Sequence, residues 1–510
     1  MTDWGNSSEI HRSLAVLTST QIAGGEAFMR TLEWLMVVLT VPALAWTLIV
    51  RRPWPLWVRA AVVGSVILLP FHAFFEGAHW QMAPIYLAIL LLLCPAVRAP
   101  GKLMSIVAVA AAILMAVGLS FCLALPMFHL PKTTGAYRVG TRTMYFVDPS
   151  RQEDHPHAPR GNREVVVQVW YPTTAATGPH AVYRLWKECD VRSSYQAVLK
   201  TDSLQDAPVA MGKFPVILFN HAWRGFRNRS TFIMQELASH GFVVVGISHP
   251  YNAAIVQLHD GQVADGRSQV DLGNFYQKPA LTLEQRLDLA NKEMQVETDD
   301  DKLVLDQLSA ANDPGANPFA GRLDLTHVGA FGHSFGGNVS AELSRDDSRV
   351  VSAILLDGVL HGPVGETGLN KPLFRIEAQA PEVPPGSENS PIQSTRVHAE
   401  MSKLGEGNLA NSFRRFGGYQ VVIGGIDHEN FTDKGFFSPF HQLTGIGEIP
   451  QARAAAIINA YVLAFFEQTL KGQPQPILSE QKPRFPEVVQ LQTWRAGSTS
   501  TSIPAASSAK

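Results

Sequence analysis

The chain has 510 residues, well above the typical domain size of about 100 to 150, so we expect more than one folded unit. It carries 42 Lys and Arg against 44 Asp and Glu, for a formal net charge of -2, and this balance gives no general attraction for nucleic acid. Only 3 Cys are present, too few for a disulfide scaffold or a zinc site built from paired Cys motifs.

Residues 32–131 form a strongly apolar segment with only about seven charged side chains. Four successive apolar runs with so few charges have no polar face to present to water, so we predict four transmembrane helices. The first thirty residues mix acidic and basic side chains and lack one apolar stretch behind a basic start, which argues against a cleaved signal peptide. The four runs are 34–50, 60–75, 77–97 and 103–128.

The charges between these runs predict an orientation. Arg51, Arg52 and Arg59 lie between the first two runs, and Arg98 and Lys102 lie between the third and the fourth. Basic loops remain on the cytoplasmic side of a membrane. We therefore expect an integral protein of a bacterial inner membrane, with both termini and the C-terminal domain on the periplasmic or extracytoplasmic side.

Four ionisable side chains lie within or beside the apolar runs: Glu33, His72, Glu76 and His79. All four fall near the ends of the predicted helices, where we expect interfacial water to solvate them. They do not resemble a proton relay or a pore, so transport is not favoured.

From about residue 133 the pattern changes to short β-branched runs that alternate with amphipathic stretches. Several runs are continuously apolar, which is typical of strands covered by helices on both faces. We therefore predict a doubly wound, mostly parallel α/β domain. The expected strands are 164–171, 215–220, 242–248, 325–331, 350–357, 372–378 and 419–424, and the expected helices include 230–240, 284–308 and 451–470.

These patterns divide the chain into a membrane region at 1–131, an α/β domain at 132–480 and a C-terminal tail at 481–510. The tail ends in a low-complexity Ser/Ala/Thr sequence, so we expect it to be partly disordered. Two segments, 252–280 and 380–395, are longer than a connection requires, and they either cover an active site or are surface insertions.

A Gly-x-Ser-x-Gly sequence follows the expected strand 325–331, with Gly332, Ser334 and Gly336 as its fixed positions. A serine on a sharp turn between a strand and a helix is forced outward, and only small neighbours allow so tight a bend. We therefore expect Ser334 to be a nucleophile.

A serine hydroxyl needs an imidazole to take its proton and a carboxylate to orient that imidazole. His428 is the best-placed base, because it lies on a loop directly after the expected strand 419–424. Two acids end strands after the serine: Asp357 closes the first and Glu377 the second. The spacing alone leaves the choice between them open.

A set of short segments occurs in a fixed order over residues 133–471: VVVQVWYP, FPVILFNHAWRG, GHSFGGN, AILLDG, KPLFRIEA and GIDHENFTD. This ordered set resembles the plasma-type platelet-activating factor acetylhydrolases and their bacterial α/β-hydrolase relatives. The resemblance implies an α/β-hydrolase fold. It also implies that Ser334 is the nucleophile, Asp357 the acid and His428 the base, with Glu377 as the alternative acid.

The oxyanion hole requires backbone N–H groups directed at the developing negative charge. One should come from Phe335, directly after the nucleophile. The resemblance implies that Trp223 supplies the other, at a position where relatives carry His-Gly-Leu-Gly and this chain has His-Ala-Trp-Arg at 221–224. Loss of both glycines restricts the backbone and adds two large side chains at this position. This departure affects the substrate that the resemblance implies more than it affects the triad.

These features predict a membrane-anchored serine esterase that needs no metal and no cofactor. The resemblance implies a phospholipid substrate with a short or oxidised acyl group at sn-2. Another carboxylic ester, including a polyester, is an alternative, and a non-catalytic membrane sensor is an alternative of another class. The expected partners are the ester or lipid substrate and the lipid bilayer, with no nucleic acid.

Overall fold

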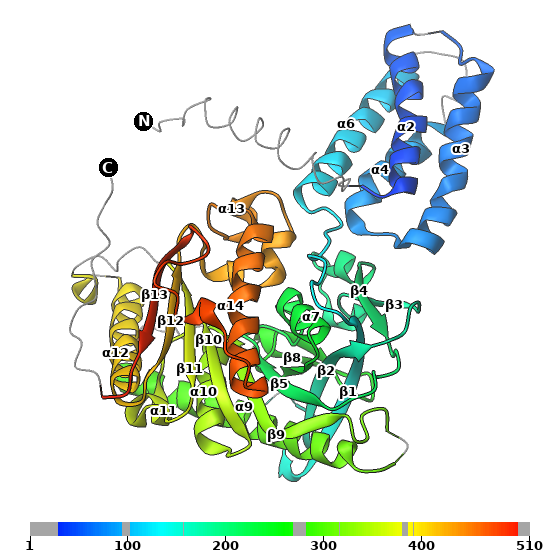
Figure 1. Ribbon diagram of the computed structural model, residues 1–510. Helices are drawn as coiled ribbons and strands as arrows, with labels where there is room; N and C mark the ends of the chain where they lie inside the picture. Colours follow the sequence, from blue (N-terminus) through cyan, green and yellow to red (C-terminus); the bar gives the residue numbers. More distant parts are fainter. Residues whose placement is uncertain are drawn as a thin grey trace. The chain divides into compact units, whose positions relative to one another are not determined.

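The computed structural model describes residues 29–50, 52–93, 102–156, 158–268, 282–315, 317–379, 386–390 and 392–497. Two compact units make up the chain (Figure 1). The first consists of Met1–Phe128 with Phe437–Pro439, and the second consists of His129–Phe436 with Phe440–Lys510.

The first unit is helical, and three of its helices are long and apolar enough to cross a membrane: Thr31–Val50, Leu56–Gly77 and Lys102–Ala124. A shorter apolar helix, Trp80–Leu91, lies between the second and third of these. The predicted run 77–97 ends in residues outside the described part of the chain, so the structure supports three spans and leaves the fourth as a prediction. The component elements are α2 (Thr31–Ala45), η2 (Trp46–Val50), α3 (Leu56–His72), η3 (Ala73–Gly77), η4 (Trp80–Met82), α4 (Ala83–Leu91) and α6 (Lys102–Ala124).

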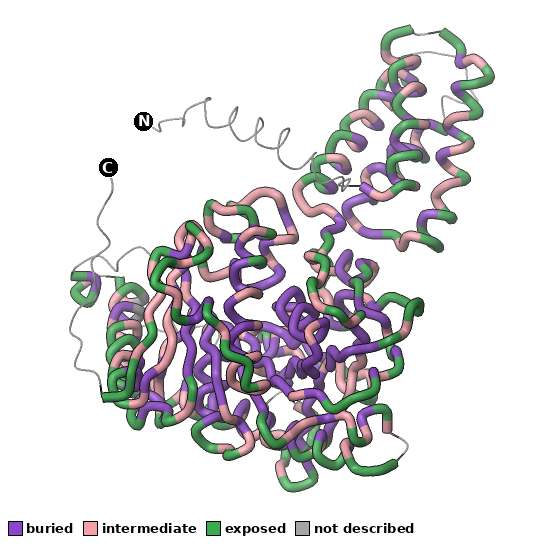
Figure 2. Tube along the Cα trace, in the orientation of Figure 1, coloured by how far each residue is buried: buried purple, intermediate pink, exposed green. Residues whose placement is uncertain are grey.

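Exposed positions alternate with buried ones along these helices (Figure 2). Many of the exposed residues are large and apolar. Met36, Ile85 and Met115 form part of a buried core between the helices, whereas Leu56 is 83% exposed and Phe74 is 82% exposed. Leaving such a side chain in water forgoes about 1.5–3 kcal/mol of burial free energy. An apolar outer surface of this kind is therefore compatible with a lipid environment.

The ionisable side chains at the helix ends differ from expectation. Glu33 is 1% exposed and His72 is 0% exposed, and the His79 side chain is 2% exposed. Our prediction that interfacial water solvates these groups is therefore wrong for these three residues. The pattern of each helix gave no sign of this, because the burial arises where the ends of several helices meet.

The second unit is built on an eleven-stranded sheet with the order β13-β12-β11-β10-β9-β5-β6-β2-β1-β4-β3 (Figure 1). Six neighbouring strands, β12, β11, β10, β9, β5 and β6, run parallel to one another. Strand β2 pairs with β6 and strand β13 with β12, both antiparallel. The predicted mostly parallel α/β sheet is confirmed. The strands are β1 (Arg138–Gln152), β2 (Asn162–Thr173), β3 (His180–Val182), β4 (Lys200–Gln205), β5 (Phe214–Asn220), β6 (Val243–Ser248), β9 (Leu323–His333), β10 (Val350–Leu356), β11 (Leu373–Ala378), β12 (Gly418–Ile423) and β13 (Val488–Trp494).

Helices cover both faces of this sheet, which explains why its strands are continuously apolar. In β5, Ile217 and Phe219 belong to the core beneath α7 (Thr231–Ser239) and α14 (Gln451–Lys471). Their neighbours Val216 and Leu218 belong to the opposite core, beneath α9 (Leu283–Asn312) and α10 (Phe335–Asp346). The helices α11 (Gly362–Thr367) and α12 (Gln393–Phe416) extend this second layer.

Two parts of this unit go beyond the sequence prediction. Strand β13 pairs with β12, so the sheet continues past residue 480, where we expected the domain to end. The segment 252–280 contains a small ribbon, β7 (Ile255–Gln257) with β8 (Val263–Asp265), and its residues 269–280 lie outside the described part. The expected disordered end at 498–510 also lies outside the described residues.

A buried ion pair joins strand β2 to helix α9. The Arg163 guanidinium, whose side chain is 6% exposed, donates to both carboxylate oxygens of Asp300, at 3.1 and 2.7 Å. Asp300 is fully buried, and the charge of Arg163 outweighs that burial and holds the pKa of the Asp300 carboxyl well below its usual range. Removal of the Arg163 guanidinium would leave the negative charge of Asp300 buried without these two hydrogen bonds and without the positive charge that balances it.

Arg163→Met is therefore expected to lower the free energy of unfolding by about 3–5 kcal/mol at neutral pH. The matched control is Arg453→Met, which removes a surface pair with Glu487 in which the arginine side chain is 41% exposed, and which should cost about 0–1 kcal/mol. Urea unfolding of the detergent-solubilised chain, followed by fluorescence, measures both. Equal losses in the two variants would show that the buried pair is not a major source of stability.

Candidate active site

Ser334 lies on the turn between β9 and α10, as the sequence predicted. Its backbone has φ 55 and ψ -119, an uncommon conformation for a residue with a side chain, and its N–H donates to Leu356 O at 2.8 Å. Such a conformation costs on the order of 1–3 kcal/mol and persists where the surrounding structure enforces it, often at functional sites. The turn thus presents the Ser334 side chain in the way that a nucleophile elbow requires.

The two glycines of the motif are required by close backbone approaches. A Cβ atom on Gly332 would lie 2.1 Å from Gly336 O, and one on Gly336 would lie 2.2 Å from Asn220 O at the end of β5. Neither position can therefore hold a side chain without moving backbone. The same contacts hold the serine turn against the segment that follows β5.

His428 and Asp357 are 71 residues apart in the sequence, and the fold brings them into contact. His428 begins the short helix η9 (His428–Phe431) after β12, and its Nδ1 lies 2.5 Å from Asp357 Oδ2. The other oxygen, Asp357 Oδ1, accepts from Ala378 N at 2.9 Å. The carboxylate thus fixes a proton on Nδ1 and leaves the lone pair on Nε2, which is the tautomer that a general base needs.

The alternative acid, Glu377, is engaged elsewhere. It accepts from Gln420 Nε2 at 2.6 Å and pairs with the Arg375 guanidinium at 2.8 Å. Burial raises the pKa of its carboxyl against the opposing charge of Arg375. The contact with the imidazole therefore belongs to Asp357, and Glu377 is part of a neighbouring charge cluster.

His333 links the serine turn to the histidine loop. Its ring lies 4.3 Å from the His428 ring, centre to centre, and its Nε2 is 3.0 Å from the His428 carbonyl oxygen. Burial lowers the pKa of His333 well below its usual value, so the ring is neutral and donates from Nε2. The residue before Ser334 thus holds the backbone of His428, a role that its place in the sequence did not indicate.

Two side chains shape the loop that carries His428. Asn430 Oδ1 accepts from Asp427 N at 2.7 Å and from Gly447 N at 2.8 Å, and its Nδ2 donates to Gln451 Oε1 at 2.8 Å. The Asp427 side chain in turn accepts from His428 N at 2.7 Å. These hydrogen bonds keep the loop in one conformation. The sequence analysis did not identify Asn430.

A buried polar network supports the end of β5, next to the expected oxyanion segment. Asn220 Nδ2 donates to Asp301 Oδ2 at 2.8 Å and lies 3.2 Å from Ser340 Oγ. His249 Nδ1 lies 3.1 Å from Asp300 Oδ2. The sequence analysis missed this network, and the only available signal was the unusual acidic run at 299–301 within an otherwise amphipathic helix.

The segment 221–224 is where the resemblance led us to expect two large side chains in place of glycines. Arg224 has φ 55, a conformation that glycine adopts at much lower cost. Trp223 packs its ring edge-on to Phe335, with ring centres 5.1 Å apart. The two residues expected to supply the oxyanion N–H groups are thus neighbours in the structure.

Trp223 and Phe335 also border an apolar cluster between α9 and α12. Its buried members are Ala290, Val397 and Met401, and its other partly buried members are Leu283, Leu287 and Leu289. The side of the serine turn that carries Phe335 is therefore apolar. An apolar surface suits an uncharged group better than a charged group.

Comparison with known proteins agrees with this architecture. The family model described as "Platelet-activating factor acetylhydrolase, isoform II" matches residues 124–475. A "Probable 1-alkyl-2-acetylglycerophosphocholine esterase" of Arthroderma benhamiae is 26% identical over 409 residues, which are 71% of this chain and 94% of that protein. A platelet-activating factor acetylhydrolase of Cavia porcellus is 26% identical over 369 residues, 67% of this chain and 78% of that protein.

Among solved structures, a ferulic acid esterase from Streptomyces cinnamoneus superimposes with a TM-score of 0.55 at 26% identity. The match covers 72% of this chain and 99% of the esterase. The fold, the serine turn and these relatives all indicate ester hydrolysis. The chain thus belongs to the family of platelet-activating factor acetylhydrolases, isoform II, and is a carboxylic ester hydrolase.

Proposed function

We propose that the chain is a membrane-anchored serine esterase in which Ser334, His428 and Asp357 form the catalytic triad. The Ser334 hydroxyl attacks the ester carbonyl while His428 Nε2 takes its proton and returns it to the leaving alcohol. Asp357 holds the imidazole tautomer and stabilises the imidazolium that forms. Water then attacks the acyl-enzyme while His428 takes its proton, and His428 returns that proton to Ser334 as the acid product leaves.

The N–H groups of Trp223 and Phe335 are proposed to hold the oxyanion. Each such donor is worth about 2.7–4 kcal/mol in transition-state stabilisation. The close contact between the end of β5 and Gly336, together with the ring contact between Trp223 and Phe335, supports this pairing.

The observation that carries the proposal is the hydrogen bond between His428 and Asp357 beside the strained turn at Ser334. A binding protein has no need for this arrangement, and this argues against the sensor alternative. Labelling of the purified protein by a fluorophosphonate probe tests the point, because only an activated serine reacts. Binding of an ester without labelling or turnover would favour the sensor.

The same hydrogen bond predicts a pH dependence. Burial of the ring opposes protonation of His428, but the hydrogen bond and charge of Asp357 outweigh burial and raise the pKa above the ordinary value of 6.5. Only the neutral ring accepts a proton, so kcat/KM should rise with pH along a limb centred above 6.5. A profile measured with p-nitrophenyl acetate from about pH 5 to 9 gives this midpoint. A midpoint below the ordinary value would contradict the assigned contact.

The proposed substrate is a carboxylic ester with a short acyl group, such as the short or oxidised sn-2 group of a phospholipid. The relative from Arthroderma benhamiae is a probable 1-alkyl-2-acetylglycerophosphocholine esterase, which supports this substrate class. The apolar cluster at Trp223 and Phe335 supports an uncharged acyl group. The ferulic acid esterase neighbour keeps a non-phospholipid ester as the second candidate.

Turnover of p-nitrophenyl esters of increasing chain length, beside phospholipids with a short sn-2 chain, separates these substrates. The proposal expects a steep fall in kcat/KM as the acyl chain lengthens and efficient release of the sn-2 group. Indifference to phospholipid, with rapid turnover of feruloyl or other simple esters, would reject the phospholipid assignment and leave the esterase.

The long apolar helices are proposed to anchor the enzyme in a bacterial inner membrane with the hydrolase domain outside the cytoplasm. This orientation requires the four crossings that the sequence predicts, and with four crossings the basic residues between the helices support it through the positive-inside rule. Protease treatment of intact spheroplasts should cleave the hydrolase domain. Protection of that domain until the membrane is lysed would place it in the cytoplasm.

A further inference from the structure

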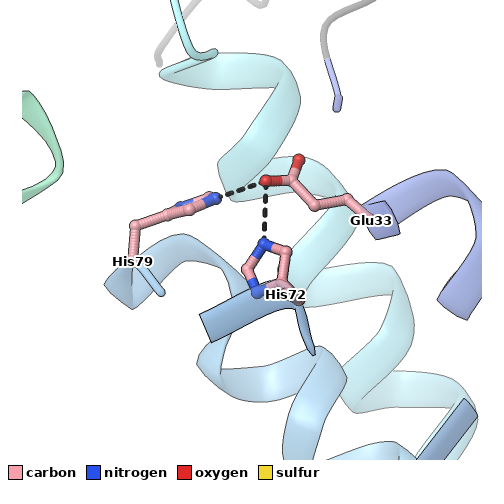
Figure 3. A group of neighbouring side chains, drawn as sticks. All are labelled: Glu33, His72 and His79. Carbon is pink, nitrogen blue, oxygen red and sulfur yellow. Dashed lines mark hydrogen bonds and ion pairs between the residues drawn. The ribbon is translucent and has the colours of Figure 1, made fainter. Parts of the chain in front are cut away.

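Three side chains of the first unit converge, two from helices and one from the link that precedes η4 (Figure 3). Glu33 lies in the first turn of α2, His72 ends α3, and His79 immediately precedes η4. Glu33 Oε1 is 3.2 Å from His72 Nε2 and 3.0 Å from His79 Nε2. All three ligand atoms lie within 4.8 Å of one another, and all three residues are buried.

The outer nitrogen of each imidazole faces a polar partner. His79 Nδ1 is 2.8 Å from Gln81 Oε1, and the amide is oriented by its Nε2, which donates to Leu125 O at 3.2 Å. His72 Nδ1 is 3.0 Å from the Tyr86 hydroxyl. Histidines that bind metals typically donate the other ring N–H to such a partner, which fixes the tautomer.

With a proton on each Nδ1, both Nε2 atoms carry lone pairs directed at the same carboxylate oxygen. Arg30 supports this assignment for His72, because its guanidinium is 3.1 Å from His72 Nε2 and donates to it. The Arg30 guanidinium, itself a cation, contacts both His72 Nε2 and Glu33 Oε1 in this structure, and a metal ion held by these two atoms would replace it there. A histidine in its neutral form is also the form that binds metals.

The carboxylates at this cluster favour a bound cation. Glu33 and Glu76 are acidic, and Arg30, which contacts both, is the basic side chain beside them. Glu76 Oε2 makes no hydrogen bond and lies 3.7 Å from His72 Nε2, so a second carboxylate is available at the cluster. An uncompensated negative charge among apolar helices is costly.

We propose that Glu33, His72 and His79 bind a divalent transition-metal ion, with Zn²⁺ as the best match. Two imidazoles and one carboxylate are a ligand set that zinc accepts in tetrahedral sites, with Glu76 or a water molecule as the fourth ligand. The ion ties the start of α2 to the connection between α3 and α4. The site is distinct from the esterase site, and the proposal does not depend on that assignment.

The test uses the full chain, purified in detergent with a tag that contains no histidine, stripped with a chelator and then equilibrated with Zn²⁺. Mass spectrometry of the metal should find about one tightly held ion per chain. Loading with Co²⁺ should give the visible absorption of a tetrahedral site. A wild-type chain that retains no stoichiometric Zn²⁺ would overturn the proposal without reference to any variant.

Variants locate the ion. His72→Ala combined with His79→Ala should abolish tight binding, whereas Tyr86→Phe and Gln81→Ala, which keep all three ligands, should each weaken Zn²⁺ binding by about 10- to 100-fold. His129→Ala removes an exposed histidine just after α6 and should leave the affinity unchanged. Zn²⁺ held equally by the wild type and the double variant would overturn the site. If the double variant aggregates, unchanged affinity in both Tyr86→Phe and Gln81→Ala would overturn it instead.

Discussion

Replacement of Ser334 by alanine is expected to lower kcat for p-nitrophenyl acetate by about 10⁶-fold and to abolish fluorophosphonate labelling. This is the order of loss found when the nucleophile of a serine hydrolase is removed, because the remaining groups cannot form the acyl-enzyme. Residual hydrolysis should stay above that in water, since the oxyanion donors still act on the substrate. Stopped and continuous esterase assays on the purified wild type and variant measure the ratio of their kcat values.

The matched control is Ser479→Ala, an exposed serine of the same unit that takes no part in the site. It should retain wild-type kcat and labelling. Thermal unfolding should show Ser334→Ala to be as stable as the wild type, because alanine keeps the Cβ atom and with it the same backbone strain. A Ser334→Ala protein that still reacts with the probe would move the nucleophile to another residue.

Asp357→Asn is expected to lower kcat by about 10⁴-fold, the loss typical of a triad whose imidazole is held in the wrong tautomer. The amide can donate to His428 Nδ1, which displaces the proton to Nε2, where the base must be free. Loss of the negative charge also removes what raises the pKa of His428, so the acid limb of the pH profile should shift to lower pH. The two readouts together distinguish a change at the imidazole from general damage.

Glu377→Gln is the matched comparison, because it is the same change from acid to amide at the other strand end. Glu377 contacts Gln420 and Arg375 rather than the imidazole, so the variant should keep most of its activity and an unshifted pH midpoint. A larger loss in Glu377→Gln than in Asp357→Asn would reverse the assignment of the acid.

The departure at Arg224 bears on both results. A positive φ of 55 is costly for a residue with a side chain, so the surroundings must hold this segment, which is proposed to supply an oxyanion N–H, in place. The buried bonds from Asn220 to Asp301 and Ser340 are such surroundings. We expect the polar network behind β5 to help set the geometry of the proposed oxyanion site.

Much of the fold could be predicted from the sequence because its signals are local. Continuous apolar runs predicted strands that are covered on both faces. Strands β5, β6 and β10 begin and end within one residue of the predicted bounds. The Gly-x-Ser-x-Gly sequence located the turn at Ser334, since close backbone contacts exclude a side chain at Gly332 and Gly336. Strand β13 escaped prediction because its pattern is ambiguous until it pairs with β12.

The sequence by itself determined the parts whose cause is short-range: the apolar helices, the strands and the strained serine turn. It left open which acid forms a hydrogen bond with His428, because Asp357 and Glu377 end neighbouring strands and the sequence does not show the direction of their side chains. Tertiary structure decided that choice by directing Asp357 to the imidazole and Glu377 to Arg375. It also buried Glu33, His72 and His79 together, since the meeting of helix ends far apart in the sequence depends on packing that no single helix encodes.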